Sequence, residues 1–144
     1  MRIELKLIEG IEEPYAVVYA GSMTEEVQNF IEAASAPAGV ITAVQEERII
    51  VLKEQDVYMI RVEEEKTAIY CRDKKYYSKK RLYELERICS RKFMKISKTT
   101  LINLSYLEGM EASFGGTMLL SLQNGCKDYV SRKYLPGLKK YLGL

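Results

Sequence analysis

The sequence predicts a mostly β protein, α+β overall, in which short antiparallel strands form a sandwich or layered sheets with one interior helix. Two observations support this fold class. From residue 40 onward, short segments rich in β-branched and aromatic residues follow one another closely. The pairs Gly115-Gly116 and Asn124-Gly125 supply tight turns between such segments. With 144 residues, the chain can bury a core without disulfides or metals.

The first part of the chain has a different pattern, and we expect it to form a strand-strand-helix extension. Alternating or β-branched residues predict two strands, and apolar residues at helical spacing predict a helix, at residues 2–8, 15–20 and 23–34 respectively. Thr24 is suited to cap that helix. The stretch 34–39 reads as a linker. We therefore place a boundary near residue 38, between an extension at 1–38 and a β-rich domain at 39–144.

The β-rich domain is expected to contain ten short strands. They are predicted at 40–44, 48–52, 57–62, 67–71, 75–78, 93–96, 100–104, 107–113, 117–122 and 128–131. Asn124-Gly125 favours a type I′ hairpin turn between the last two.

Two helices are expected within or after these strands. Ser78 is an N-cap candidate for a helix over 79–89, which directs Leu82, Leu85 and Ile88 toward a core. A short final helix is expected at 138–142, after the break at Pro136 and Gly137.

Charge is distributed unevenly along the chain. The net charge is only +2, but residues 1–36 carry two basic and seven acidic side chains, a net charge of −5. Residues 72–100 carry eleven basic and three acidic side chains, a net charge of +8. Such a run can be a solvated helix face. Because this one crosses a predicted strand, a helix and a loop, a polyanion-binding surface is the stronger interpretation.

Composition argues against catalysis, metal binding and a membrane location. The chain lacks histidine, and its three cysteines lack CxxC spacing, so we expect reduced thiols, no zinc site and no cofactor. Glu63, Glu64 and Glu65 are consecutive and read as a hairpin rim rather than paired catalytic carboxylates. No apolar run reaches the roughly 20 residues of a membrane span. We expect a cytoplasmic protein that is not an enzyme and has no small-molecule substrate.

Residues 93–107 predict a polar tip between two strands. Ser97, Lys98 and Thr99 form this tip, and lysine with small hydroxyl groups suits phosphate oxygens and the acceptor atoms of guanine. The same residues are also common in ordinary surface turns.

The surroundings of this tip resemble the LytTR family of bacterial DNA-binding domains. The resemblance rests on helical Leu-x-x-Leu spacing, a Phe, a basic and polar loop, an apolar-Asn-apolar strand and a closing hairpin with the residues after it, found at Leu82 to Leu85, Phe93, Lys95 to Thr100, Leu101 to Leu104, Leu119 to Tyr129 and Val130 to Leu135. It covers about residues 40–144.

This resemblance implies an elongated stack of small antiparallel sheets that inserts loop side chains into successive major grooves. Two copies are expected on spaced direct repeats, as a homodimer at least on DNA. It assigns base reading to Lys98, Arg132, Lys133 and, in the hairpin loop near Glu65, to Lys66. Where the family often has histidine followed by arginine, this chain has Ser97 and Lys98, so the bidentate fork to guanine is lost.

Backbone phosphates are the expected partners of a second set of side chains, namely Ser97, Thr99, Lys79, Lys80, Arg81 and Lys95. For residues 79–81, a merely solvated helix end is the alternative. For the whole domain, the alternative function is a protein-interaction module whose basic face binds an acidic partner protein.

The extension is too short for the receiver domain that is common in this family. It resembles the extension of short members encoded beside a small membrane protein, so we expect dimerisation or docking to such a partner. The alternative is that it caps an exposed sheet edge.

Overall fold

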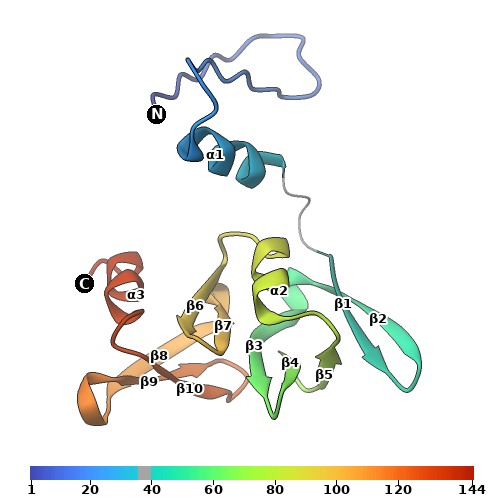
Figure 1. Cartoon of the computed structure of the whole chain (residues 1–144), viewed down its shortest axis with the longest axis vertical. Helices are drawn as coiled ribbons and strands as arrows, with labels where there is room; N and C mark the ends of the chain where they lie inside the picture. Colours follow the sequence, from blue (N-terminus) through green and yellow to red (C-terminus); the bar gives the residue numbers. More distant parts are fainter. Residues whose placement is uncertain (36–39) are drawn as a thin grey trace. The chain divides into compact units, whose positions relative to one another are not determined.

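The computed structural model describes residues 1–35 and 40–144, and the chain separates into two compact units, Met1–Ala36 and Pro37–Leu144 (Figure 1). The predicted linker at 34–39 and the boundary near residue 38 fall largely on residues 36–39, which lie outside the described residues. The two units are therefore considered one at a time.

The N-terminal unit contains helix α1 (Glu25–Ser35) but no strands in its described part. As predicted, Thr24 precedes the helix, and its hydroxyl accepts a hydrogen bond from the backbone N–H of Val27 at 3.3 Å. The strands predicted at 2–8 and 15–20 were wrong for the single chain. Two strands alone are marginally stable in water, and no third strand supports them.

The larger unit is built on two antiparallel sheets, which confirms the mostly β, α+β fold class (Figure 1). A seven-stranded sheet has the order β2-β1-β5-β4-β3-β7-β6, and a three-stranded sheet has the order β10-β9-β8. The strands are β1 (Val40–Gln45), β2 (Arg48–Lys53), β3 (Val57–Glu63), β4 (Lys66–Cys71), β5 (Lys75–Ser78), β6 (Phe93–Ser97), β7 (Thr100–Asn103), β8 (Leu107–Ala112), β9 (Met118–Leu122) and β10 (Lys127–Val130). All ten lie within one residue of their predicted ends.

Glutamate pairs form two of the two-residue hairpin connections of the seven-stranded sheet. Glu46 and Glu47 connect β1 to β2 with φ values of 48° and 64°, and Glu64 and Glu65 connect β3 to β4 with 48° and 65°. Two consecutive positive φ angles define a type I′ turn, which usually contains Asn and Gly. The interpretation of Glu63 to Glu65 as a hairpin rim therefore agrees with the structure.

The type I′ turn predicted at Asn124-Gly125 was wrong. Only Gly125 has a positive φ, and the strands end at Leu122 and resume at Lys127, which leaves a longer connection. The Asn124 side chain explains the difference: its amide donates to the Cys71 carbonyl at 2.9 Å and its oxygen accepts from the Cys126 N–H at 3.1 Å.

Helix α2 (Leu82–Ile88) begins later than predicted. The Ser78 hydroxyl accepts from the Lys80 N–H at 3.1 Å, so it stabilises a bend before the helix, and extended Arg81 occupies the N-cap position. Helix α3 (Leu135–Tyr141) begins earlier than predicted, because Pro136 fits in the first turn of a helix, where its missing N–H is not needed.

Hydrophobic cores lie on both faces of the seven-stranded sheet. Helix α2 buries Leu85 against Ile60 and Leu101 on one face. On the other face, Met59 and Ile102 pack with the three-stranded sheet and α3. Because successive strand residues point to opposite faces, neighbours such as Met59 and Ile60 serve different cores.

Asn103, the polar residue of the β7 motif, is buried. Its side-chain amide donates to the carbonyls of Glu54 at 3.1 Å and Val57 at 2.9 Å, and its oxygen accepts from the Ser105 N–H at 3.0 Å. The side chain thus fixes the start of β3 beside the end of β7.

Candidate nucleic-acid interface

Several chain connections lie close together where strands of the seven-stranded sheet end or begin. Glu63 pairs with Lys66 and Thr67 with Ser78, while Arg61 and Ser97 both pair with Thr100. The ends of β3, β5 and β6 and the starts of β4 and β7 therefore lie side by side. We call this region the loop edge and define it as residues 64–66, 78–80, 97–99 and 131–133.

The tip between β6 and β7 presents Lys98 to solvent. The Ser97 hydroxyl accepts from the Thr99 N–H at 3.2 Å and lies 3.3 Å from the Thr99 hydroxyl. The Thr99 carbonyl accepts from the Val62 N–H at 2.9 Å, which ties the tip to β3. Both hydroxyl groups thus shape the turn, and Lys98 and Thr99 are exposed at its apex.

A second exposed basic tip follows β10, at Arg132 and Lys133. The Ser131 N–H donates to the Ile96 carbonyl at 2.9 Å, which places this tip next to the end of β6. The buried Thr100 hydroxyl donates to the Asp128 carboxylate at 2.6 Å, so a side-chain contact also links β7 to β10. The structure therefore brings Lys98 and the pair Arg132-Lys133 to adjacent strand ends.

Gly116 supports the second tip and was not recognised as a site residue from the sequence. A Cβ atom at Gly116 would lie 3.1 Å from Cδ of Arg132, and the glycine has a φ of +76°. The aliphatic part of Arg132 thus lies against a position where only glycine fits comfortably. The Gly-Gly pair signals a turn, but no sequence pattern indicates which distant side chain the turn will contact.

Glu63 is the centre of an ion-pair network beside the loop edge. Its carboxylate lies 2.6 Å from Nη2 of Arg61 and 2.6 Å from Nζ of Lys75, and it also accepts from the Tyr70 hydroxyl. Partial burial opposes ionisation, but hydrogen bonds from Lys75, Tyr70 and Arg61 lower the pKa of Glu63 to about 2. Glu63 is therefore ionised at neutral pH, and Lys75 adds less free positive charge than the sequence suggests.

Other predicted residues differ in how freely they reach solvent. Lys79, Lys80 and Arg81 are exposed between β5 and α2. The ammonium of Lys66 lies 5.7 Å from the Tyr77 ring, and that of Lys133 lies 5.6 Å from the Tyr134 ring. Lys95 is partly buried within β6, 4.0 Å from a Glu86 carboxylate oxygen. Lys95 thus lies beside the loop edge rather than in it.

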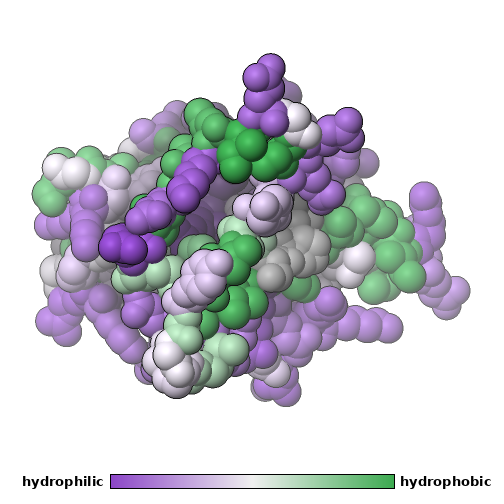
Figure 2. All heavy atoms as spheres, turned by 90° about the horizontal axis from the view of Figure 1, so that it is seen from above, coloured by the Kyte–Doolittle hydropathy of each residue, from purple (hydrophilic) through white to green (hydrophobic). Residues whose placement is uncertain are grey.

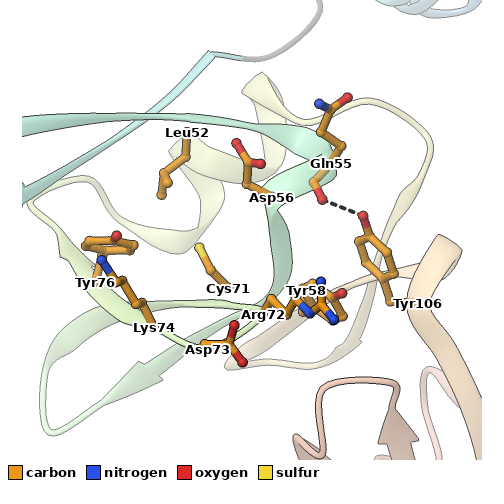
Figure 3. Close-up of a pocket in the computed structure, with 10 residues that line it drawn as sticks. All are labelled: Leu52, Gln55, Asp56, Tyr58, Cys71, Arg72, Asp73, Lys74, Tyr76 and Tyr106. Carbon is orange, nitrogen blue, oxygen red and sulfur yellow. Dashed lines mark hydrogen bonds between the residues drawn. The ribbon is translucent and has the colours of Figure 1, made fainter.

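A hollow of about 460 Å³ lies at the opposite end of β3 and β4 (Figure 3). The rings of Tyr58 and Tyr106 stack with their centroids 3.8 Å apart, and the Tyr106 hydroxyl donates a hydrogen bond to the Gln55 carbonyl. Burial, reinforced by the negative charge of Asp56, raises the pKa of the Cys71 thiol to about 11. The thiol is therefore protonated at neutral pH and poorly nucleophilic. None of the predicted site residues lines this hollow.

Two further searches covered residues 1–35 and 40–144. Within these ranges, no three or more Cys, Asp or Glu side chains are grouped so that they would hold a metal ion. No helix in them has the length and apolar character needed to cross a membrane.

Comparison with known proteins gives consistent results. A protein from Staphylococcus aureus strain NCTC 8325, described as an uncharacterized HTH-type transcriptional regulator, is 26% identical over 146 residues, which cover 100% of this chain and 99% of that protein. Its counterpart from strain MRSA252 is 25% identical with the same coverage. A solved LytTr DNA-binding domain from Bacillus cereus aligns with a TM-score of 0.67 and 22% identity over 74% of this chain and 98% of that domain.

The described elements contain no two consecutive helices, because β6 follows α2 directly. A helix-turn-helix is thus absent from residues 1–35 and 40–144, whatever the names of the relatives. The model of the family described as LytTr DNA-binding domain matches residues 47–143, which include every part of the loop edge. The chain therefore belongs to the LytTR family of DNA-binding domains.

Proposed function

We propose that this DNA-binding regulator recognises specific sequences by inserting side chains of the loop edge into successive major grooves. The observation that carries the proposal is the junction of the two basic tips. The Ser131–Ile96 and Thr100–Asp128 hydrogen bonds hold them on adjacent strand ends. Rigidly spaced basic groups are what a reader of spaced bases requires, because each must reach its base without further ordering.

Base edges are the proposed partners of Lys98, Arg132, Lys133 and Lys66. Lysine and arginine donate to O6 and N7 of guanine, the commonest specific contact in the major groove. Arg132 supplies a planar fork for two parallel hydrogen bonds, whereas the ammonium of Lys98 acts as a point charge.

Phosphates are the proposed partners of Ser97, Thr99, Lys79, Lys80, Arg81 and Lys95. The exposed cations among them, Lys79, Lys80 and Arg81, lie between the end of β5 and the start of α2. Lys95 reaches a phosphate by leaving Glu86, and a contact of 4.0 Å near the surface contributes little to stability. These contacts set register and affinity rather than sequence preference.

We further propose that two copies bind spaced direct repeats, with one loop edge reading each repeat. A single unit offers few base-contacting side chains. Two linked units multiply the discrimination and raise the effective concentration of the second unit.

A competition titration tests the proposal. Labelled duplexes from the chain's own upstream region are titrated with protein at several salt concentrations, with and without shuffled competitor DNA. A specific reader prefers its site by about 10³-fold or more, and its log affinity falls steeply with log salt. Equal binding to native and shuffled duplexes would contradict sequence reading. Failure to bind any duplex, with retained binding to an acidic protein, would favour the protein-interaction module.

A further inference from the structure

The N-terminal unit exposes a segment with strand character that has no strand partner within residues 1–35 and 40–144 of the single chain. In residues 2–8, Ile3, Leu5 and Leu7 are 75%, 83% and 90% exposed. Figure 2 shows apolar side chains open to solvent among polar ones on the surface of the molecule. An alternating segment with an uncovered apolar face and free backbone groups is a template for pairing with another chain.

We infer that residues 2–8 pair antiparallel with the same residues of a second copy, so that this segment forms the two-fold centre of a dimer. In a two-fold dimer each patch contacts itself, so the segment must be complementary to its own reversed sequence. Residues 3–7 meet this condition in one register, in which Leu5 lies on the symmetry axis.

In that register, Ile3 lies opposite Leu7 of the second copy and Leu5 lies opposite Leu5, on one face of the pair. On the other face, Glu4 lies opposite Lys6, and this pairing occurs twice. Directly opposite side chains in an antiparallel pair are close enough for apolar packing and for ion pairing. Both faces are therefore matched over residues 3–7, and the outermost pair places Arg2 opposite Ile8.

Neighbouring registers bring like charges opposite each other or mix charged and apolar side chains on one face. An axis at Glu4 places Glu4 against itself and Arg2 against Lys6, while an axis at Lys6 places Lys6 against itself. Like charges directly opposite each other are destabilising. If one strand slides by a single residue relative to the other, charged and apolar side chains lie on the same face, because side chains alternate with a period of two.

The segment itself carries little net charge. The segment 2–8 carries two basic residues and one acidic residue, whereas most of the acidic charge of the unit lies outside it, in residues 9–32. In the single chain, Glu4 lies 3.4 Å from Arg2, but both side chains are highly exposed, so this contact scarcely competes. Residues 15–20 would extend the pair to a four-stranded sheet, which passes the size at which a sheet becomes stable.

The register is tested with single cysteines in the full chain, without DNA, so the outcome is independent of the proposed DNA-binding function. Leu5→Cys places two thiols opposite each other, with Cα atoms at about 4.5–5.5 Å, within disulfide range. Leu7→Cys is the matched control, because the two residues 7 lie four positions apart along the pair, beyond disulfide reach. The native thiols are half-buried, and burial raises the pKa of Cys71 and Cys89, so they compete poorly.

We expect mild oxidation to convert most Leu5→Cys protein to a covalent dimer and to leave Leu7→Cys largely monomeric on a denaturing gel. Comparable cross-linking of the two variants, or none in either, would overturn the register. Sedimentation of the unmodified chain at tens of micromolar should give a dimer, and a monomer would overturn the inference altogether.

Charge exchange provides a second test. Glu4→Lys and Lys6→Glu each place like charges opposite one another twice, so each variant alone should dissociate at least several-fold more readily. Mixing the two variants restores both opposite-charge pairs and should yield a mixed dimer. If the mixture associates no better than either variant alone, the Glu4–Lys6 pairing is wrong.

Discussion

Lys98 lies at the apex of the tip between β6 and β7, in a turn shaped by hydrogen bonds between Ser97 and Thr99. In the proposed role its single ammonium donates to guanine without the planar fork of arginine, so it selects its base less strictly. At the same scale, the aliphatic part of Arg132 lies against the backbone of Gly116, which has a φ of +76°.

Replacing Lys98 is predicted to separate affinity from specificity. Lys98→Ala should reduce the preference for the specific site by about 1–3 kcal/mol, whereas Lys80→Ala should weaken specific and shuffled duplexes equally. Lys98→Arg should increase discrimination, because it restores the fork to guanine. Competition titrations of the three variants measure this, with Lys74→Ala, an exposed lysine beside the hollow at the opposite end of β4, as the control. Similar behaviour of Lys98→Ala and Lys80→Ala would show that reading and positioning residues are assigned incorrectly.

We predict that Asn103 contributes to the stability of the fold. Asn103→Ala leaves the Glu54 and Val57 carbonyls and the Ser105 N–H without their partner in a buried site. We expect the free energy of unfolding to fall by about 3 kcal/mol, which is in the range for buried polar groups left without a hydrogen-bond partner. Urea denaturation measures this, with Asn124→Ala as a less buried comparison. A loss below about 1 kcal/mol would contradict the structural role.

Element boundaries show how far sequence reasoning extends. The ten strands of the larger unit were predictable because each is short, apolar and bounded by turns, and the sheets supply the neighbours that each strand needs. The same pattern at 2–8 and 15–20 gave no strands in the single chain, because no third strand is present there. At Asn124, a side-chain contact with Cys71 overrode the local preference for a type I′ turn.

Contacts between elements were beyond the reach of sequence reasoning in the candidate site. The motif located Lys98, Arg132 and Lys133, but the link between Thr100 and Asp128 and the support of Arg132 by Gly116 depend on strands that meet only in the folded sheets. Likewise, the charge run included Lys75 without showing that Glu63 neutralises it.

The Thr100–Asp128 contact is predicted to couple the two tips. Thr100→Val keeps the volume but removes the hydroxyl, so the chain should fold with a loss of about 1–2 kcal/mol while specific DNA affinity falls several-fold. Thr42→Val, on β1, is the control in thermal melts and DNA titrations. Unchanged affinity in Thr100→Val would mean that the tips are positioned without this contact.

We predict that replacing Glu64 and Glu65 in the β3–β4 turn can increase the stability of the fold. Replacing the pair with Asn-Gly removes two left-handed glutamates and should stabilise the fold by about 1–2 kcal/mol. For a domain of this size the melting temperature rises by about 4–8 °C per kcal/mol. The same exchange at Glu46-Glu47 should stabilise equally, but only the change at 64–65 should alter DNA binding, because only it lies in the loop edge. Destabilisation by either exchange would contradict the assigned turn type.

At the scale of the whole molecule, the two units have opposite net charges and are assigned different functions. The unit with a net charge of −5 carries the strand segment that we assign to self-association, and the remainder, with a net charge of +7, carries the loop edge. The proposed two-fold axis relates the paired extensions, whereas direct repeats require both loop edges to face the same way along the duplex. The two DNA-binding units must therefore bind without following the axis of the extensions.

Methylation interference at guanine N7 tests the central claim, that the loop edge reads bases in the major groove, most directly. N7 of guanine lies in the major groove and N3 of adenine in the minor groove, and dimethyl sulfate modifies both. Methylated guanines should be depleted from the bound fraction at clustered positions in each repeat, and Lys98→Ala should lose part of that pattern. Interference at adenine N3 without interference at guanine N7 would contradict the account.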